Sequence, residues 1–247
     1  MTGRTASVVR VAADKLERNI NIIKYSLFCF NVIAWILGIT LLAFCLYLRT
    51  DTEFQEWIDI LEIWSFNYGL YILIIIGFII LFVPCVGCAS VYQEQNQILM
   101  INAGMQMFCF LALLIGSAFL LENSTVNSRI QGMIRNTVTR MILYSVENDN
   151  TERVLNAVQE NIGCCGADGP MDYVNLNRAL PTECRDTVTG NAFFHGCVDE
   201  VTWYLEEKSE WITGIAVFLS TMHVLIAVLN VVLKQALELE EKMPYRR

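Results

Sequence analysis

The residues best suited to chemistry in this chain are its nine cysteines. Four of them share one segment of the chain, at positions Cys164, Cys165, Cys184 and Cys197. In an oxidising compartment an even number of cysteines pairs as disulfides, and their spacing leaves all three possible pairings open. A zinc site is the alternative, but no C-x-x-C spacing occurs among these four residues and an oxidising compartment disfavours zinc. We therefore expect two disulfides and no metal.

Other reactive constellations are missing from the sequence. The chain contains no G-x-S-x-G, no H-E-x-x-H and no glycine-rich phosphate loop. Of its two histidines, only His195 lies in the cysteine-rich segment, so a nucleophile there would have no other candidate base. His195 is better explained as a loop residue beside Cys197. We predict a protein that is not an enzyme and binds no cofactor or small-molecule substrate.

Four long uncharged stretches indicate membrane spans. Hydrophobic residues make up 55% of the chain and charged residues only 17%, against about 25% charged in a soluble domain. The uncharged stretches are 25–48, 63–93, 95–121 and 211–233. Each is long enough, as a helix, to cross a hydrocarbon layer of about 30 Å. The first stretch is not a signal peptide, because it is too long and no small-residue cleavage site follows it. These stretches predict an all-α membrane protein with four transmembrane helices.

The distribution of charge predicts how the spans are oriented. Five Lys and Arg residues precede the first span and four follow the last, whereas residues 122–210 hold seven basic residues against fourteen acidic ones. By the positive-inside rule both termini are cytoplasmic. The net charge of −8 disfavours nucleic-acid binding. The predicted layout is a cytoplasmic N-terminus (1–24), spans at 25–48, 68–92, 97–121 and 211–233, a small outer loop (49–67), a short cytoplasmic loop (93–96), a large outer loop (122–210) and a cytoplasmic C-terminus (234–247).

Apolar spacing predicts two helices at the start of the large outer loop. Residues 128–145 place apolar side chains at steps of three and four, which marks one helix face: Ile130, Met133, Ile134, Val138, Met141 and Ile142. A second helix is expected to begin at a cap formed by Asn150 or Thr151 and to end at Gly163. Its apolar face holds Val154, Leu155, Val158 and Ile162. The two helices are expected to cover one another.

Polar residues inside the spans are expected to serve helix packing. Asn31 and Asn230 lie at similar shallow depth and are candidates for hydrogen bonds across helices, while Gln106 and His223 lie near mid-membrane. No Asp or Glu lies deep in any span, which disfavours a transporter. Glycines along the spans are expected to permit close helix approach, at positions 38, 69, 77, 104, 116 and 214.

Two kinds of covalent modification are candidates. Cys85 and Cys88, at the cytoplasmic end of the second span, and Cys29 in the first are candidates for S-acylation. The alternative is that a free cysteine is a small buried apolar residue, which is our interpretation of Cys45 and Cys109. Asn123 begins the N-x-S/T sequon of the chain, but it adjoins the third span, so the membrane restricts access to it.

A combined set of motifs identifies a family. The set comprises C-C-G at 164–166, P-x-x-C at 181–184, G-C at 196–197, N-x-x-x-W-x-x-G at 31–38, and Gly87-Cys88 followed by Glu94. On these residues the chain resembles a tetraspanin over nearly its whole length, although Gln95 replaces the usual Asn after Glu94. The resemblance implies disulfides Cys164–Cys197 and Cys165–Cys184, a disulfide-stapled and mainly helical large extracellular loop, and partners among integral membrane proteins, other tetraspanins and membrane lipids.

Shorter runs narrow the resemblance within the family. They are residues 159–167, 184–188, 191–194 and the closing 245–247. These runs are similar to a tetraspanin of insect smooth septate junctions. That similarity implies a plasma-membrane protein at lateral cell–cell contacts, which helps to assemble occluding junctions in gut-type epithelia together with junctional membrane proteins.

Two functions follow from these expectations. The first is a membrane scaffold that organises lateral partner complexes. The second is an adhesion or receptor protein that binds a ligand on an opposing cell through its large outer loop. Candidate partner-binding residues are two aromatic pairs, Phe193-Phe194 and Trp203-Tyr204, because aromatic side chains are enriched at interface hot spots. The alternative is that these aromatics pack against the two outer helices.

Overall fold

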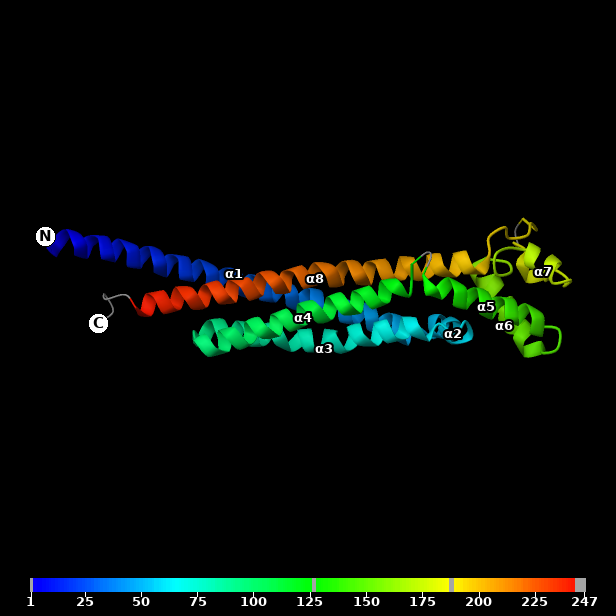
Figure 1. Ribbon diagram of the computed structural model, residues 1–247, viewed down its shortest axis with the longest axis horizontal. Coiled ribbons are helices and arrows are strands. Elements are labelled where there is room, and N and C mark those ends of the chain that lie inside the picture. Colours follow the sequence, from blue (N-terminus) through cyan, green and yellow to red (C-terminus); the bar gives the residue numbers. More distant parts are fainter. Residues whose placement is uncertain (1, 126–127, 187–188, 243–247) are drawn as a thin grey trace. The chain divides into compact units, whose positions relative to one another are not determined.

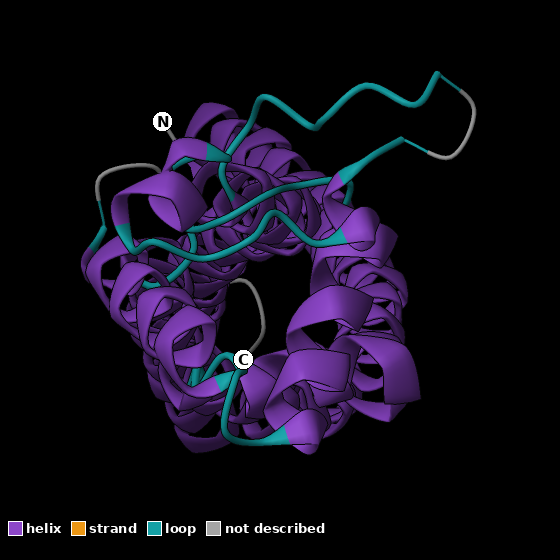
Figure 2. Ribbon diagram, turned by 90° about the vertical axis from the view of Figure 1, so that its right-hand side faces the viewer, coloured by secondary structure: helices purple, strands orange, loops and turns teal. Residues whose placement is uncertain are grey.

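The computed structural model describes residues 2–125, 128–186 and 189–242. Within these ranges the chain is helical, and Figure 2 shows helices joined by loops without a strand. The α-helices, labelled in Figure 1, are α1 (Thr2–Thr50), α2 (Thr52–Ile60), α3 (Trp64–Gln93), α4 (Asn96–Glu122), α5 (Arg129–Tyr144), α6 (Asp149–Ile162), α7 (Met171–Asn175) and α8 (Cys197–Glu241). A 3₁₀-helix, η1 (Thr182–Cys184), lies between α7 and α8. The prediction of an all-α fold is confirmed.

Four helices, α1, α3, α4 and α8, are long and apolar enough to cross a membrane, which confirms the four predicted spans. Helices α1 and α8 extend well beyond the uncharged stretches that predicted them. The extension has a local reason, because neither residues 4–37 nor residues 197–211 contain glycine or proline. Once a helix has begun, each further residue adds a backbone hydrogen bond, so a flanking segment without glycine or proline readily extends it.

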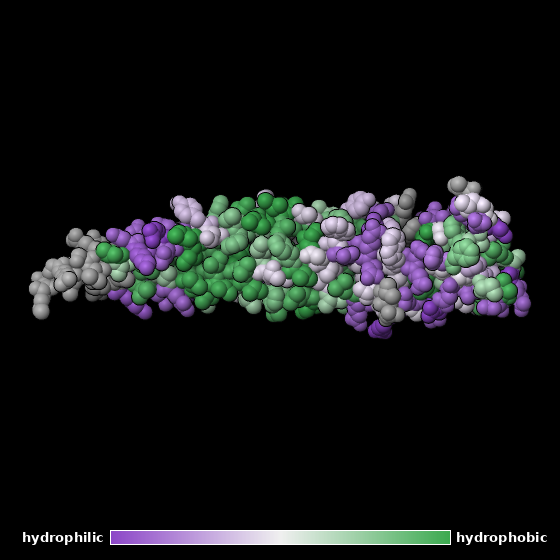
Figure 3. Space-filling view, turned by 90° about the horizontal axis from the view of Figure 1, so that it is seen from above, coloured by the Kyte–Doolittle hydropathy of each residue, from purple (hydrophilic) through white to green (hydrophobic). Residues whose placement is uncertain are grey.

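The described chain forms two compact units, and the first contains Met1–Ala43, Leu73–Ile115 and Ile215–Arg247. Glycines bring α1 and α3 together within it. A Cβ added at Gly38 would lie 2.6 Å from Cγ2 of Ile80, and one at Gly77 would lie 3.1 Å from Cδ1 of Leu42. Gly104 has no such neighbour within 4 Å, so our expectation of close helix approach is wrong there. On the face seen in Figure 3, hydrophobic side chains gather in one broad region, as expected of a surface in contact with lipid.

The second unit contains Phe44–Ile72 and Gly116–Gly214. Helix α5 follows the predicted bounds and buries Ile130, Ile134, Val138, Met141 and Ile142, whereas Met133 is 40% exposed and does not belong to the buried face. Close approach is confirmed at Gly69, whose added Cβ would meet the Leu120 backbone at 3.3 Å, but Gly214 has no such neighbour within 4 Å.

The bounds of α6 correct one prediction and confirm another. Its N-cap is Asn148, whose side chain accepts hydrogen bonds from the backbone N–H groups of Asn150 and Thr151. The predicted caps at Asn150 and Thr151 are therefore wrong, because both residues are already inside the helix. Gly163 ends α6 in the left-handed conformation, at φ 76°, as predicted.

A short helix in the first loop was not predicted. Helix α2 buries Phe54 and Ile58, and Leu61 directly after it is also buried. The Phe54 ring meets the ring of Phe66 edge to face, with centroids 5.5 Å apart. Aromatic pairs of this geometry contribute about 0.5–1.5 kcal/mol beyond the area they bury. This packing holds α2 against the start of α3.

Candidate interaction surface

Two disulfides staple the large loop, and one of them ties it to the first residue of α8. Cys164 bonds Cys197 and Cys165 bonds Cys184, with Cα–Cα distances of 4.9 Å and 5.0 Å. All four residues are buried. The pairing that the family resemblance implied is confirmed.

Backbone hydrogen bonds add to the staple. The N–H of Cys165 donates to the carbonyl oxygen of His195, and the N–H of Cys197 donates to that of Gly166, both at 3.0 Å. His195 therefore holds the C-C-G turn through its backbone, while its side chain is exposed. It lies in a loop beside Cys197, as predicted.

An ion pair ties the C-C-G turn to α5. The Arg135 guanidinium donates to both carboxylate oxygens of Asp168, from Nε at 2.9 Å and from Nη2 at 2.7 Å. This hydrogen bonding to Asp168 raises the pKa of Arg135. Asp168 also donates its backbone N–H to Asp172 at 2.7 Å. Because both charged side chains are about half exposed, the ion pair adds little to stability. Its main effect is to fix the position of Asp168 relative to α5.

Helix α8 and the first loop complete the scaffold of this unit. Glu62, which lies between α2 and α3, forms an ion pair with Arg140 of α5, with 2.8 Å between Oε1 and Nη2. Ser124 donates to the hydroxyl of Ser209 on α8 at 2.7 Å. The ring of Tyr204 lies 6.2 Å from that of Phe54.

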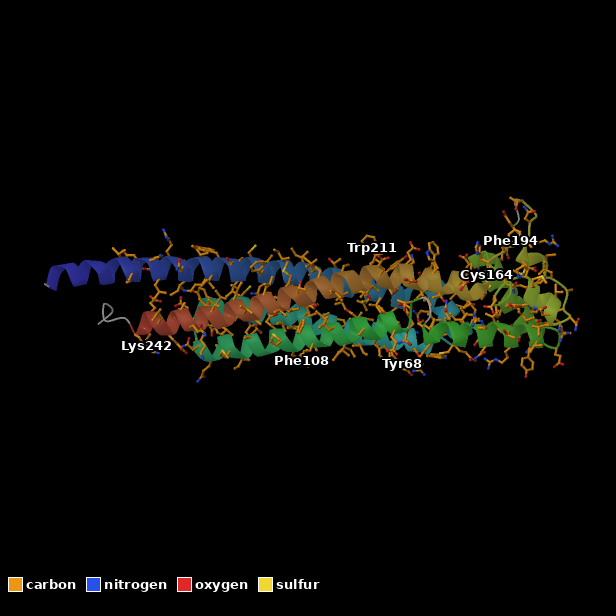
Figure 4. All side chains as sticks on the ribbon, turned by 45° about the horizontal axis from the view of Figure 1, so that its top comes forward. Tyr68, Phe108, Cys164, Phe194, Trp211 and Lys242 are labelled. Carbon is orange, nitrogen blue, oxygen red and sulfur yellow. A yellow bond between two sulfur atoms is a disulfide. The ribbon has the colours of Figure 1, made fainter. Side chains whose placement is uncertain are left out.

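The four aromatic candidates divide into two kinds. Phe193 is partly buried and donates its backbone N–H to Cys184 at 2.9 Å, and Tyr204 packs on Phe54. By contrast, Phe194 is 84% exposed and Trp203 is 62% exposed. Figure 4 labels Phe194 on the loop that precedes α8. Sequence alone left packing and partner binding open for all four. Phe193 and Tyr204 make contacts within the fold, and partner binding stays a prediction for the exposed Phe194 and Trp203. We call Phe194 and Trp203 the aromatic patch.

In the membrane helices of the first unit, two of the four polar candidates meet. His223 of α8 forms a buried hydrogen bond through Nδ1 with Oε1 of Gln106 on α4. Asn31 and Asn230 instead donate to carbonyls of their own helices, those of Leu27 at 2.8 Å and Ile226 at 2.9 Å. The expectation that these asparagines bond across helices is not met, because a carbonyl one turn back lies closer to each amide.

Gly87 is a packing residue that sequence reasoning missed. A Cβ added there would lie 2.5 Å from Oδ1 of Asn31. The buried Asn31 amide therefore fits against α3 only because residue 87 has no side chain. The Gly87-Cys88 motif was the available signal, but its contact was not evident from one sequence.

We predict that Gln106 and His223 are energetically coupled. Replacing either one by leucine leaves a buried polar partner unpaired, whereas replacing both removes that cost. A double-mutant cycle on detergent-solubilised protein is expected to give a coupling of about 0.6 kcal/mol, the average for interhelical hydrogen bonds in membranes. Additive effects of the two single substitutions would contradict the pairing.

The candidate modification sites differ in access. Cys29 and Cys85 are exposed on the membrane helices and Cys88 is partly exposed, whereas Cys45 and Cys109 are buried. This agrees with our interpretation of Cys45 and Cys109 as packing residues. Asn123 is half-buried and donates its amide to Phe119 at 2.7 Å. Acylation and glycosylation stay predictions.

Comparisons with known proteins agree with this architecture. The sequence model of the Tetraspanin family matches residues 23–236. The chain is 44% identical to Tetraspanin-2A of Drosophila melanogaster, over 95% of this chain and 96% of that protein. It is 24% identical to the human CD9 antigen, over 90% of this chain and 96% of that protein. It is also 19% identical to the mouse CD151 antigen, over 88% and 93% respectively. With four membrane helices and a loop stapled through C-C-G, the chain belongs to the tetraspanin family.

Proposed function

We propose that this tetraspanin is a non-enzymatic scaffold that holds other integral membrane proteins in lateral complexes at the plasma membrane, with both termini in the cytoplasm. The observation that carries the proposal is the aromatic patch, which is exposed on a frame fixed by two disulfides. A rigid frame lowers the entropic cost of binding, because little of the surface must be ordered when a partner docks.

The height of Trp203 above the membrane supports a partner-binding role. Trp203 and Trp211 lie on the same helix, eight residues apart and both exposed, which places them about 12 Å apart along its axis. Trp211 is the first residue of the uncharged stretch of α8, where aromatic residues of an interfacial belt are expected. Trp203 is therefore too far from the bilayer to belong to that belt. An exposed tryptophan outside the belt favours a protein contact.

The narrower proposal is a role in assembling septate junctions of epithelia. It is supported by the sequence runs that resemble an insect smooth-septate-junction tetraspanin, and by the 44% identity to the Drosophila relative. Residues Thr187, Val188 and 245–247 of these runs lie outside the described part of the structure. The proposed partners are junctional membrane proteins, other tetraspanins and membrane lipids. Acylation of Cys85, Cys88 or Cys29 would strengthen the lipid contacts.

We expect substitution of the aromatic patch to reduce partner recovery. In a polarised epithelium, the tagged protein is expected to concentrate at lateral occluding junctions and to crosslink to junctional membrane proteins. Phe194→Ser with Trp203→Ser removes two exposed anchors, each worth about 1–2 kcal/mol or more at a hot spot, so crosslinked partners should fall at least about tenfold. Immunogold microscopy and a crosslinked pull-down measure both effects.

Trp211→Ser serves as the matched control, because it removes an exposed tryptophan of the same helix at the predicted membrane interface. An even distribution of the wild type over the cell surface would contradict the junctional role. Lost adhesion to opposing cells with lateral partners intact would instead favour the adhesion receptor.

A further inference from the structure

A cavity of about 350 Å³ opens in the large loop between α6 and the segment that follows α7. Its walls are mixed in character. Leu155, Val146 and Leu180 supply apolar surface, while Asn156 and Arg178 supply polar groups. No part of the proposed scaffold function accounts for this cavity.

The fold places Arg178 at this cavity through a defined turn. At the end of α7 the N–H of Arg178 donates to Tyr173 at 2.8 Å, and the N–H of Asn177 donates to Val174 at 3.0 Å. Asn177 has φ 52°. Together these form a Schellman motif with Asn177 in the left-handed position. Because the motif fixes the backbone, the base of the Arg178 side chain is held in place before any ligand arrives.

Arg178 is partly buried and, unlike Arg135 and Arg140, lacks an acidic partner. Arg135 pairs with Asp168 and Arg140 pairs with Glu62, whereas within the described residues no carboxylate lies within ion-pairing distance of Arg178. Its Nη2 donates only to the backbone carbonyl of Leu143, at 3.4 Å, and its buried Nε has no partner. A buried donor without an acceptor is costly, and a guanidinium most favours a bidentate carboxylate.

Tyr173 is a buried residue that lines this cavity, and its hydroxyl accepts a hydrogen bond from Gln159 at 2.7 Å. Burial raises the pKa of Tyr173 to about 12, so the phenol stays neutral and does not compete for Arg178. Glu152 lines the same cavity and is exposed, so it opposes an incoming carboxylate.

We propose that this cavity binds an acidic peptide segment of a partner protein, with one carboxylate on Arg178 and a neighbouring apolar side chain against Val146 and Leu180. Val146 is 63% exposed and therefore available for such a contact. The site is a second contact surface beside the aromatic patch. It adds partner chemistry to the proposed scaffold, and peptide binding can be measured whether or not the junctional role holds.

The test uses the full chain in lipid nanodiscs and a fluorescein-labelled peptide of alternating Glu and Leu. Fluorescence anisotropy is expected to show saturable binding. A matched Gln–Leu peptide should bind at least about tenfold more weakly, because a charge-assisted hydrogen bond is lost. Arg178→Gln should weaken binding of the Glu–Leu peptide to the same extent, whereas Glu152→Gln should make its binding tighter. Phe194→Ser should leave binding of this peptide unchanged.

The peptide comparison requires no variant, so the proposal can be tested even if Arg178→Gln does not fold. Absence of saturable binding would overturn the proposal. Equal binding of the two peptides, or unchanged binding to a folded Arg178→Gln protein, would overturn it as well. Binding of sialyllactose in place of the peptide would assign the cavity to a glycan carboxylate and would also reject the peptide.

Discussion

Replacing Cys164 and Cys197 together by serine is expected to unfold the large loop while the membrane helices stay inserted. This disulfide closes a sequence separation of 33 residues. In the chain-entropy model, closing a loop of that length contributes about 4 kcal/mol by restricting the unfolded chain. The large loop is a small domain with a limited apolar core, so this is a large share of its stability. Limited proteolysis of the protein in nanodiscs would measure the effect.

Cys165→Ser with Cys184→Ser opens a shorter separation of 19 residues, for which the same model gives about 3 kcal/mol. The second pair should therefore be slightly less damaging than the first. Cys29→Ser is the control, since that cysteine is free and exposed. Equal protease resistance of the wild type and the Cys164/Cys197 variant would show that the packing of α5 and α6 suffices without the bridge.

The membrane helices were predictable because their signal is physical and local. A stretch without charge that is long enough to cross the bilayer has few other stable states, since a lipid-exposed backbone must satisfy its own hydrogen bonds. Helix α5 was predictable for a similar reason, because its apolar side chains recur at helical spacing. Met133 fits that spacing yet is exposed. Periodicity marks a face, but the neighbours decide how wide the buried part of it is.

The first residue of α6 could not be predicted from the local sequence. Four residues in succession, 148–151, are all suited to N-capping, so composition could not choose among them. The chain uses Asn148, the first of the four.

Helix α2 was missed because nine residues carrying three acidic side chains give little helix signal alone. Its stability comes from Phe54 against Phe66, which lies beyond its own sequence.

The interaction surface was predictable only in part. Aromatic residue types pointed to Phe193, Phe194, Trp203 and Tyr204, but exposure depends on the path of the loop. The buried Nε of Arg178 left no signal in the sequence, because the loop contains other arginines and only the fold shows which of them is partly buried. Asn177 was the one local hint, since asparagine tolerates the left-handed conformation that ends α7.

Gly166→Ala is expected to destabilise the large loop by about 2–5 kcal/mol. Gly166 has φ +68°, and an added Cβ would overlap the carbonyl oxygen of Gly169. The left-handed backbone costs an L-residue about 1–2 kcal/mol, and forcing a methyl group into a filled site costs about 1–3 kcal/mol more. The backbone cannot move away easily, because the carbonyl of Gly166 accepts from the N–H of Cys197. Chemical denaturation followed by protease resistance of the loop would measure the loss.

Substitutions at two other glycines separate the cost of the left-handed backbone from the cost of the steric overlap. Gly190 has φ +72° but no neighbour within 4 Å of an added Cβ, so Gly190→Ala should cost only the backbone contribution of about 1–2 kcal/mol. Gly132 lies inside α5 with open space around it, so Gly132→Ala should stabilise the helix by about 0.5–1 kcal/mol. The expected order of stability is therefore Gly132→Ala above wild type, then Gly190→Ala, then Gly166→Ala. If Gly166→Ala and Gly190→Ala destabilised the loop equally, the close approach of Gly169 would not be the reason that the C-C-G turn requires glycine.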